Sequence, residues 1–408
     1  MLLFFGGKAL SADVVTQLPD MSRGDYLTVK IAVIGPGDEL YLWWGHIGLI
    51  IEDTLSGESR LYDWGVFSFE ETNFYSNFAF GRLLYACAVT SVDSNFNRNI
   101  RTNRSITVYT LDLPPEKKLE ILRFAENNAR PENRNYWYHH FRDNCATRIR
   151  DIVDLGTSGN FYLRYAQAPG RLTLRGHVRR HTWFSPLWDW LLSFWMGQDI
   201  DTPITVWDEM FLPSEIGKRI EDFTYMAQGT ERHLVSSVEV INEAEGRPPV
   251  LDAPRKSWPG AFLLSIAAAA LFGFPALFAK KRNAARIAFG LGQSALGLFL
   301  GVIGLLLFFM TFFTNHDYTF HNSNVLFINP LLFAALPFGL VYAFTGNEKK
   351  RRRAAGILWI LWTYVFVGAA LSAALKILPG FYQQNQVTLA LVLPAALALS
   401  LMSRRLAR

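Results

Sequence analysis

Three side chains are best suited to chemistry, and one is a cysteine in the stretch HHFRDNCATRIRD. Cys145 lies in this stretch, and the chain has only one other cysteine, Cys87. Asp143 or Asn144 predicts a helix N-cap, and ATRIRDIVDL continues as a helix. Cys145 then falls in the first turn, where the helix dipole and unpaired N–H groups favour a thiolate and can form part of an oxyanion hole. A small buried thiol is the alternative interpretation.

A nucleophilic cysteine needs a base, and the chain offers eight histidines. His46 opens the predicted strand HIGLIIED (46–53), so its backbone is held rigidly. The neighbouring predicted strand carries Asp63, either as a carboxylate that orients His46 or as a turn residue before Gly65. The remaining histidines of this half are expected beside the site or at the surface: His139, His140, His177, His181 and His233.

The elements that position these residues read as strands followed by helices. β-rich runs separated by turn residues predict five strands: 26–35, 46–53, 59–69, 83–89 and 105–113. The period then changes, and PPEKKLEILRFAENNA (114–129) predicts a helix that starts at a proline. This pattern indicates an α+β domain.

Hydrophobicity is unevenly distributed along the 408 residues, of which 50% are hydrophobic and 18% charged. Residues 25–257 have mixed polarity, whereas 258–408 contain runs long enough to cross a bilayer core of about 30 Å. Five spans are predicted at 259–279, 286–313, 325–345, 355–378 and 386–403. The sequence therefore predicts a globular domain followed by a transmembrane domain, preceded by a short N-terminal stub (1–24) that we interpret as a possible remnant of an export signal.

Lys and Arg fall on alternate loops and predict the orientation. AKKRNAAR (279–286), GNEKKRRR (346–353) and SRRLAR (403–408) are basic, whereas the two intervening loops have no Lys or Arg. The positive-inside rule places the basic loops and the C-terminus in the cytoplasm and the globular domain in the periplasm. The cysteine spacing indicates neither a metal site nor a disulfide framework, and no nucleotide or nucleic-acid motif is evident, so we expect no cofactor, no metal and no nucleic acid.

The order of strand histidine, neighbouring carboxylate and helix cysteine resembles the circularly permuted papain-like (NlpC-type) enzymes. The match becomes more specific in six segments that resemble the Lnb family of bacterial lipoprotein N-acyltransferases. These segments are WWGHIGLIIED, LYDWGVFSF, the block around Cys145, APGRLTLRG with WDEMFLPSEI, and NHDYTFHNSNVLFINPL (315–331).

This resemblance implies a function for each half of the chain. Cys145 would be the acyl-accepting nucleophile, His46 its base and Asp63 the third member. A membrane phospholipid would donate an acyl chain through a thioester to the α-amine of a diacylglyceryl lipoprotein, at the bacterial inner membrane. Residues expected to contact substrate are Asn144, Arg148, His140, Tyr62, Trp44, His316 and Asn324, of which the last two would hold a lipid headgroup or cap helix ends.

Two other functions use the same features. A membrane-anchored NlpC-type cysteine peptidase or amidase acting on cell-wall peptides would need the same cysteine and histidine. A non-catalytic membrane scaffold would need neither. The aromatic segment HTWFSPLWDWLLSFWMG (181–197) is too short to span a bilayer and is expected either at the headgroup interface or in a buried core.

Overall fold

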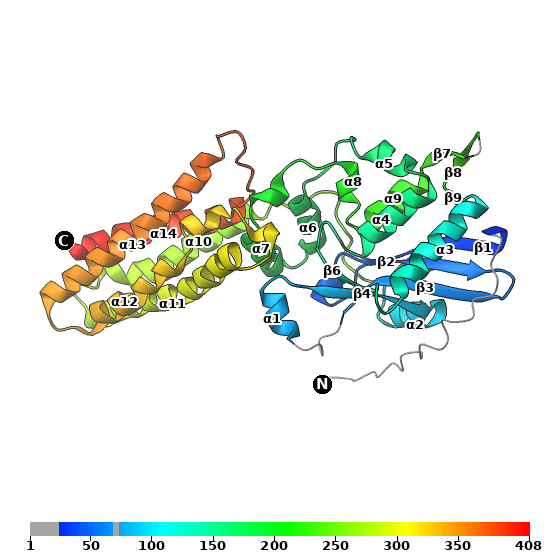
Figure 1. The fold of residues 1–408 in the computed structure, drawn as a ribbon. Coiled ribbons are helices and arrows are strands. Elements are labelled where there is room, and N and C mark those ends of the chain that lie inside the picture. Colours follow the sequence, from blue (N-terminus) through cyan, green and yellow to red (C-terminus); the bar gives the residue numbers. More distant parts are fainter. Residues whose placement is uncertain (1–23, 68–72, 228) are drawn as a thin grey trace. The chain divides into compact units, whose positions relative to one another are not determined.

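The computed structural model describes residues 24–67, 73–227 and 229–408, which fall into two compact units (Figure 1). The sheet unit comprises 24–67, 84–166 and 210–245, and the remaining described residues form the helical unit. The predicted N-terminal stub, apart from its last residue, lies outside the described residues. This division follows internal contacts, whereas the predicted boundary after residue 257 follows membrane topology and stays a prediction.

The sheet unit is built on one antiparallel sheet in the order β6-β4-β3-β2-β1-β5-β9. Its strands are β1 (Leu27–Ile34), β2 (His46–Asp53), β3 (Glu58–Val66), β4 (Leu84–Ser91), β5 (Ile106–Leu111), β6 (Asn135–Trp137) and β9 (Val235–Asn242). β2 lies in the middle and is almost wholly buried, as its continuous apolar run predicts. The five predicted strands are confirmed. The short β6 and the largely exposed β9, which form the sheet edges, carry too weak a hydrophobic pattern to be recognised.

Helices pack on this sheet and bring the cysteine to it. The other elements of this unit are α2 (Val92–Arg101), α3 (Pro115–Ala129), α4 (Cys145–Gly156), α5 (Asn160–Tyr165), α9 (Pro213–Glu221), the hairpin β7 (Thr224–Ala227) and β8 (Thr230–His233), and the turns η2 (Gly24–Tyr26) and η3 (Leu40–Leu42). α4 packs against β2, β3 and α3, and it buries Ile149, Ile152 and Val153. α4 therefore lies against the two strands that carry His46 and Asp63.

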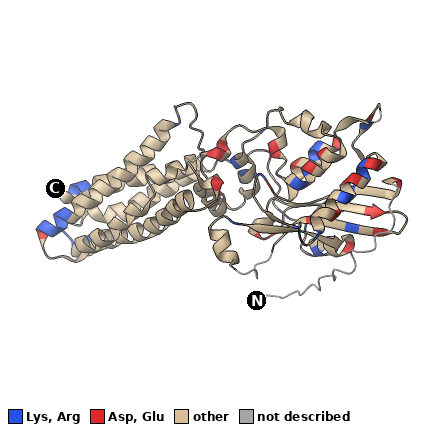
Figure 2. Ribbon diagram, viewed as in Figure 1, with Lys and Arg blue, Asp and Glu red and all other residues tan. Residues whose placement is uncertain are grey.

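The helical unit contains five segments long and apolar enough to cross a membrane. They are Trp258–Leu277, Asn283–Phe313, Ser323–Phe344, Glu348–Leu375 and Gln386–Ala407, and they match the predicted spans in number and position. These segments hold α10 (Trp258–Gly273), η5 (Phe274–Leu277), α11 (Asn283–Phe313), η7 (Ser323–Leu326), η8 (Pro330–Ala334), α12 (Ala335–Phe344), α13 (Glu348–Leu375) and α14 (Gln386–Ala407). The chain is a multi-pass membrane protein whose spans carry little charge away from their ends, and Lys and Arg gather at the start of α13 and the end of α14 (Figure 2).

Glycines on α11 allow the third span to pack closely. A Cβ at Gly297 would lie 2.6 Å from Ala335 Cβ, and one at Gly304 would lie 2.5 Å from the backbone of Asn329. Small residues at such spacing let helix backbones approach closely in a membrane, where packing replaces the hydrophobic effect as the driving force. This contact holds the irregular start of the third span against α11.

The rest of the helical unit corrects one prediction about histidines. Its remaining elements are α1 (Phe74–Ala79), α6 (Leu174–Thr182), α7 (Pro186–Trp195), η4 (Gln198–Asp201), α8 (Val206–Glu209) and η6 (Asp317–Thr319). The prediction that His177 and His181 lie at the surface is wrong, because they are only 0% and 3% exposed. His177 Nε2 pairs with Glu209 Oε1 at 2.9 Å, so a buried carboxylate compensates the polar ring.

The aromatic segment 181–197 is partly buried in the core and partly exposed. In α7, Phe194 is 1% exposed and belongs to the core of the bundle. On the same helix Leu187 is 62% exposed and Trp188 is 41% exposed. One side of α7 therefore packs on the bundle, while the exposed apolar residues leave its position at a headgroup interface a prediction.

Candidate active site

Cys145 is the first residue of α4, and the helix cap fixes its backbone. The N-cap is Asn144, whose Oδ1 accepts hydrogen bonds from the N–H groups of Ala146 at 2.8 Å and Thr147 at 2.9 Å. Thr147 Oγ1 in turn accepts from the Asn144 N–H at 2.8 Å, which completes a capping box. The cap thus satisfies two of the first-turn N–H groups. It leaves the N–H of Cys145 unpaired within the described part of the chain, at the positive end of the helix dipole.

His46 is held between Asp63 and the thiol. Its Nε2 lies 2.8 Å from Asp63 Oδ1, and its side chain also hydrogen-bonds to Cys145. Both strand residues are largely covered, with side-chain exposures of 17% for His46 and 7% for Asp63. Since Nε2 faces the carboxylate, Nδ1 is the ring nitrogen left for the thiol, which is the arrangement expected of a base with an orienting partner.

Gly65 makes room for this histidine. A β-bulge separates Asp63 from Val66 on β3, and the Gly65 N–H within it donates to Asp63 Oδ1 at 2.7 Å. A Cβ at Gly65 would lie 2.4 Å from His46 Cε1, closer than real Cβ contacts occur. The Asp-Trp-Gly sequence therefore orients the carboxylate and leaves space for the ring, and Asp63 serves both the bulge and His46.

Electrostatics favour a charged imidazole at this position. Burial lowers the pKa of His46, but the charges of Asp63 and Cys145 and hydrogen bonds to both outweigh it, and the pKa is raised to about 10. For Asp63, burial raises the pKa, yet the charge and hydrogen bond of His46 and the Gly65 N–H hold it below its usual range. The site therefore favours a protonated His46 imidazolium with an ionised Asp63 behind it.

Cys87 provides the contrast within the same unit. It is 1% exposed and free, and burial together with the charge of Asp63 raises its pKa to about 12. A buried thiol of this kind is unreactive. Cys145, partly exposed and bonded to His46, is the cysteine with nucleophilic surroundings.

An aromatic wall near the thiol was not recognised in the sequence. Burial raises the pKa values of Tyr85 and Tyr136, and the charge of Cys145 raises them further, which locates both rings near the sulfur. Tyr85 stacks on Tyr138 with a centroid distance of 4.0 Å, and Tyr138 meets His140 edge to face at 5.3 Å. The edge strand β6 and its neighbour β4 supply this wall, and the run NYWYHH was the only sign of the short β6 in the sequence.

The predicted substrate residues around the cysteine have different surroundings. Asn144 is 4% exposed and its amide also donates to His140 O at 2.7 Å and Phe211 O at 3.1 Å, so it is committed to the fold. Arg148 forms a two-pronged ion pair with Asp143 at 2.6 and 2.8 Å. His140 is exposed on the aromatic wall, which leaves it accessible to a substrate.

Tyr62 on β3 and Trp44 just before β2 differ in burial and in hydrogen bonding. Tyr62 is 1% exposed and stacks on Trp64, and burial raises its pKa to about 12, so it packs the core. Trp44 precedes His46 by one glycine, and its buried Nε1 has no hydrogen-bond partner among the described residues. Trp44, in the turn before β2, is thus a residue whose ring N–H has no hydrogen-bond partner within the described ranges.

The two remaining predicted residues belong to the helical unit. His316 bonds through Nε2 to Phe78 O at 2.9 Å and through Nδ1 to Tyr318 at 2.8 Å. Asn324 is fully buried, donates to Phe194 O at 3.1 Å and accepts from Asn385 at 2.8 Å. His316 therefore joins its loop to α1, and Asn324 joins α7 to the start of the third span and to Asn385. Within the described ranges, no group of three or more His, Cys, Asp or Glu could hold a metal ion.

Fold and site together define a class: a multi-pass membrane protein with an α+β domain carrying a Cys–His–Asp cluster. Residues 21–180 match the family model of the Lnb N-terminal periplasmic domain, a range that contains all three residues of the cluster. These residues are similar to that domain, and the match supports membership of the Lnb family. No curated protein and no solved structure matches the chain.

Proposed function

We propose that the protein is a membrane-bound lipoprotein N-acyltransferase that works through a thioester on Cys145. The acyl donor is a membrane phospholipid, and the acceptor is the α-amine of a diacylglyceryl-cysteine at a lipoprotein N-terminus. The observation that carries this proposal is the Cys145–His46–Asp63 cluster at a helix N-terminus in a domain of the Lnb family. We place the protein in the bacterial inner membrane with the sheet domain in the periplasm and the C-terminus in the cytoplasm, as the basic loops predict.

The first step is attack of the Cys145 thiolate on the carbonyl carbon of the phospholipid ester. The C–S bond forms, the ester C–O bond breaks, and the His46 imidazolium gives its proton to the departing lipid oxygen. The products are an acyl thioester on Cys145, a lysophospholipid and a neutral His46. Asp63 keeps the ring oriented throughout.

In the second step, the lipoprotein amine attacks the thioester carbonyl. His46 takes the proton that the amine loses, the C–N bond forms, and the thiolate departs, which restores the ion pair. Thioesters react readily with amines, so two easier steps replace a direct ester-to-amide transfer. Water would hydrolyse the thioester, and docking on a bilayer excludes it while presenting both lipid substrates.

Both steps develop negative charge on the acyl oxygen. The Cys145 N–H, which the Asn144 cap leaves unused, is suited to accept that charge at the positive end of α4. The unpartnered Nε1 of Trp44 is the second donor that we assign to this role. His140 and the tyrosine wall are available to contact the lipid.

Labelling of the full-length protein tests this function. The protein is reconstituted with a phospholipid carrying an alkyne-tagged acyl chain, and Cys145→Ala is compared with Cys87→Ala, which leaves Cys145 as the sole thiol. We expect an adduct removed by hydroxylamine on wild type and Cys87→Ala but not on Cys145→Ala. Addition of a synthetic diacylglyceryl-cysteine peptide should then move the label into a hydroxylamine-resistant amide.

Two results would refute the transferase. Lipoprotein N-termini that stay fully acylated in cells whose only copy is Cys145→Ala would remove the cysteine from the reaction. Cleavage of cell-wall peptides by the purified protein without an acyl adduct would instead establish the peptidase or amidase, which uses the same cluster.

A further inference from the structure

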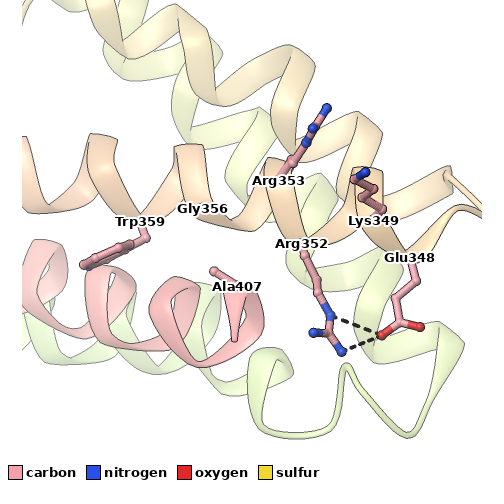
Figure 3. A pocket seen from close by; sticks show the side chains of 7 residues that line it. All are labelled: Glu348, Lys349, Arg352, Arg353, Gly356, Trp359 and Ala407. Atoms are coloured by element: carbon pink, nitrogen blue, oxygen red, sulfur yellow. Dashed lines mark hydrogen bonds and ion pairs between the residues drawn. The ribbon is translucent and has the colours of Figure 1, made fainter.

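A cavity of about 680 Å³ lies where α13 begins and α14 ends, at the basic end of the helical unit (Figure 3). Its charged lining comes from the first turns of α13: Glu348, Lys349, Arg352 and Arg353. Its apolar lining comes from Gly356, Trp359 and Ala407. The cavity thus joins a cationic mouth to an apolar floor.

The cations at the mouth are incompletely neutralised. Arg352 pairs with Glu348 at 2.7 Å, one turn earlier on the helix. In the described part of the chain neither Lys349 nor Arg353 has an ion-pair partner, and Figure 3 shows both side chains directed away from Glu348. They are spaced i,i+4, where like charges repel, and they stand at the positive end of the α13 dipole. An anion at this position would reduce both the repulsion between the two cations and their unfavourable interaction with the helix dipole.

The floor has the shape and chemistry of a lipid contact. A Cβ at Gly356 would meet no atom within 4 Å, so the absence of a side chain keeps this space open. Trp359 borders the space, and the Arg404 guanidinium lies 5.5 Å from the centre of its ring. Tryptophan favours the membrane–water interface, where a phosphate and its glycerol backbone also lie. A free inorganic anion would gain no binding energy from this apolar surface.

We propose that this cavity binds the phosphate group of an anionic phospholipid, with the glycerol region against Trp359 and Gly356. Basic pockets between transmembrane helices bind such headgroups through the positive charge that they concentrate. The positive-inside rule places this end in the cytoplasmic leaflet, away from the proposed periplasmic chemistry, so the bound lipid is a structural ligand and not the acyl donor. The inference does not depend on the proposed acyltransferase activity.

The test compares variants of the full-length protein in detergent micelles by native mass spectrometry. Phosphatidylglycerol is titrated against phosphatidylcholine, and soluble glycerol phosphate is a third ligand. For Lys349→Gln with Arg353→Gln we expect phosphatidylglycerol binding to weaken about 30-fold, since each cation near a membrane surface contributes a factor of roughly five. Both residues are exposed, so the fold should tolerate the change.

Two further variants separate a site from diffuse charge. Gly356→Leu fills the floor and keeps every cation, and it should abolish the preference for phosphatidylglycerol; Gly356→Ala is the milder version if leucine impairs folding. The control, Lys280→Gln with Lys281→Gln, removes the same charge from another basic loop and should leave binding unchanged. Equal weakening by the control, retention of binding in both Gly356 variants, equal binding of phosphatidylcholine, or binding of glycerol phosphate as tight as that of the lipid would each overturn the proposal.

Discussion

Gly65→Ala offers a sharp test of the candidate active site, because it moves His46 without changing any chemical group of the cluster. The new Cβ would lie 2.4 Å from His46 Cε1, whereas ordinary van der Waals contact begins at 3.4 Å. The ring must therefore move by about 1 Å, and a misplacement of that size can cost about 100-fold in rate. No positive φ applies at Gly65, so the backbone itself accepts alanine.

The assay is the rate of formation of the hydroxylamine-sensitive adduct on Cys145, with thermal unfolding measured in parallel. Gly48→Ala is the matched control on the strand of His46. Its Cβ would press on Leu61 at 3.1 Å and leave His46 untouched, so we expect a stability change with little change in rate. If Gly65→Ala forms the adduct at the wild-type rate while it is folded, the assigned position of His46 as base is refuted.

Three other variants test single parts of the site. Asp63→Asn removes a charge that raises the pKa of His46, so the imidazolium should deprotonate at lower pH. In the wild type, the stabilising contribution of the imidazolium is present below about pH 6.5 and is lost toward pH 10. The adduct rate should fall by as much as about 10⁴-fold, and an unchanged pH–rate profile would contradict this role. Trp44→Phe keeps an aromatic side chain but removes Nε1–H, and a 10²–10³-fold slower acylation at unchanged melting temperature would support an oxyanion contact. A wild-type rate would remove Trp44 from the mechanism. Asn144→Ala should lower stability by about 1–2 kcal/mol through loss of the cap, measured as a lower melting temperature in detergent, and unaltered melting would show that the cap contributes little.

In the helical unit, composition predicts the membrane spans but not which polar residues are buried. Span number and position follow from apolar length alone, because a bilayer requires a continuous hydrophobic run whatever its neighbours. The buried histidines of α6 could not be recognised in this way. His177 is stable in the interior only because Glu209, far along the chain, supplies a carboxylate at 2.9 Å, and local polarity had indicated a surface.

In the sheet unit, the sequence by itself determined which residue types could act and where the strong elements begin. HIGLIIED, the capped helix start at Cys145 and the Asp-Trp-Gly stretch each carry a local pattern, because strands, caps and turns depend on nearby residues. Only the tertiary structure decided that Nε2 of His46 faces Asp63 and that the missing side chain of Gly65 leaves room for the His46 ring. It also decided that Asn144 caps α4, that Arg148 pairs with Asp143 and that Tyr62 is buried, whereas Trp44 Nε1 has no partner in the described part of the chain. These assignments depend on strand register, a bulge and side-chain pairing across distant segments, and no local pattern encodes them.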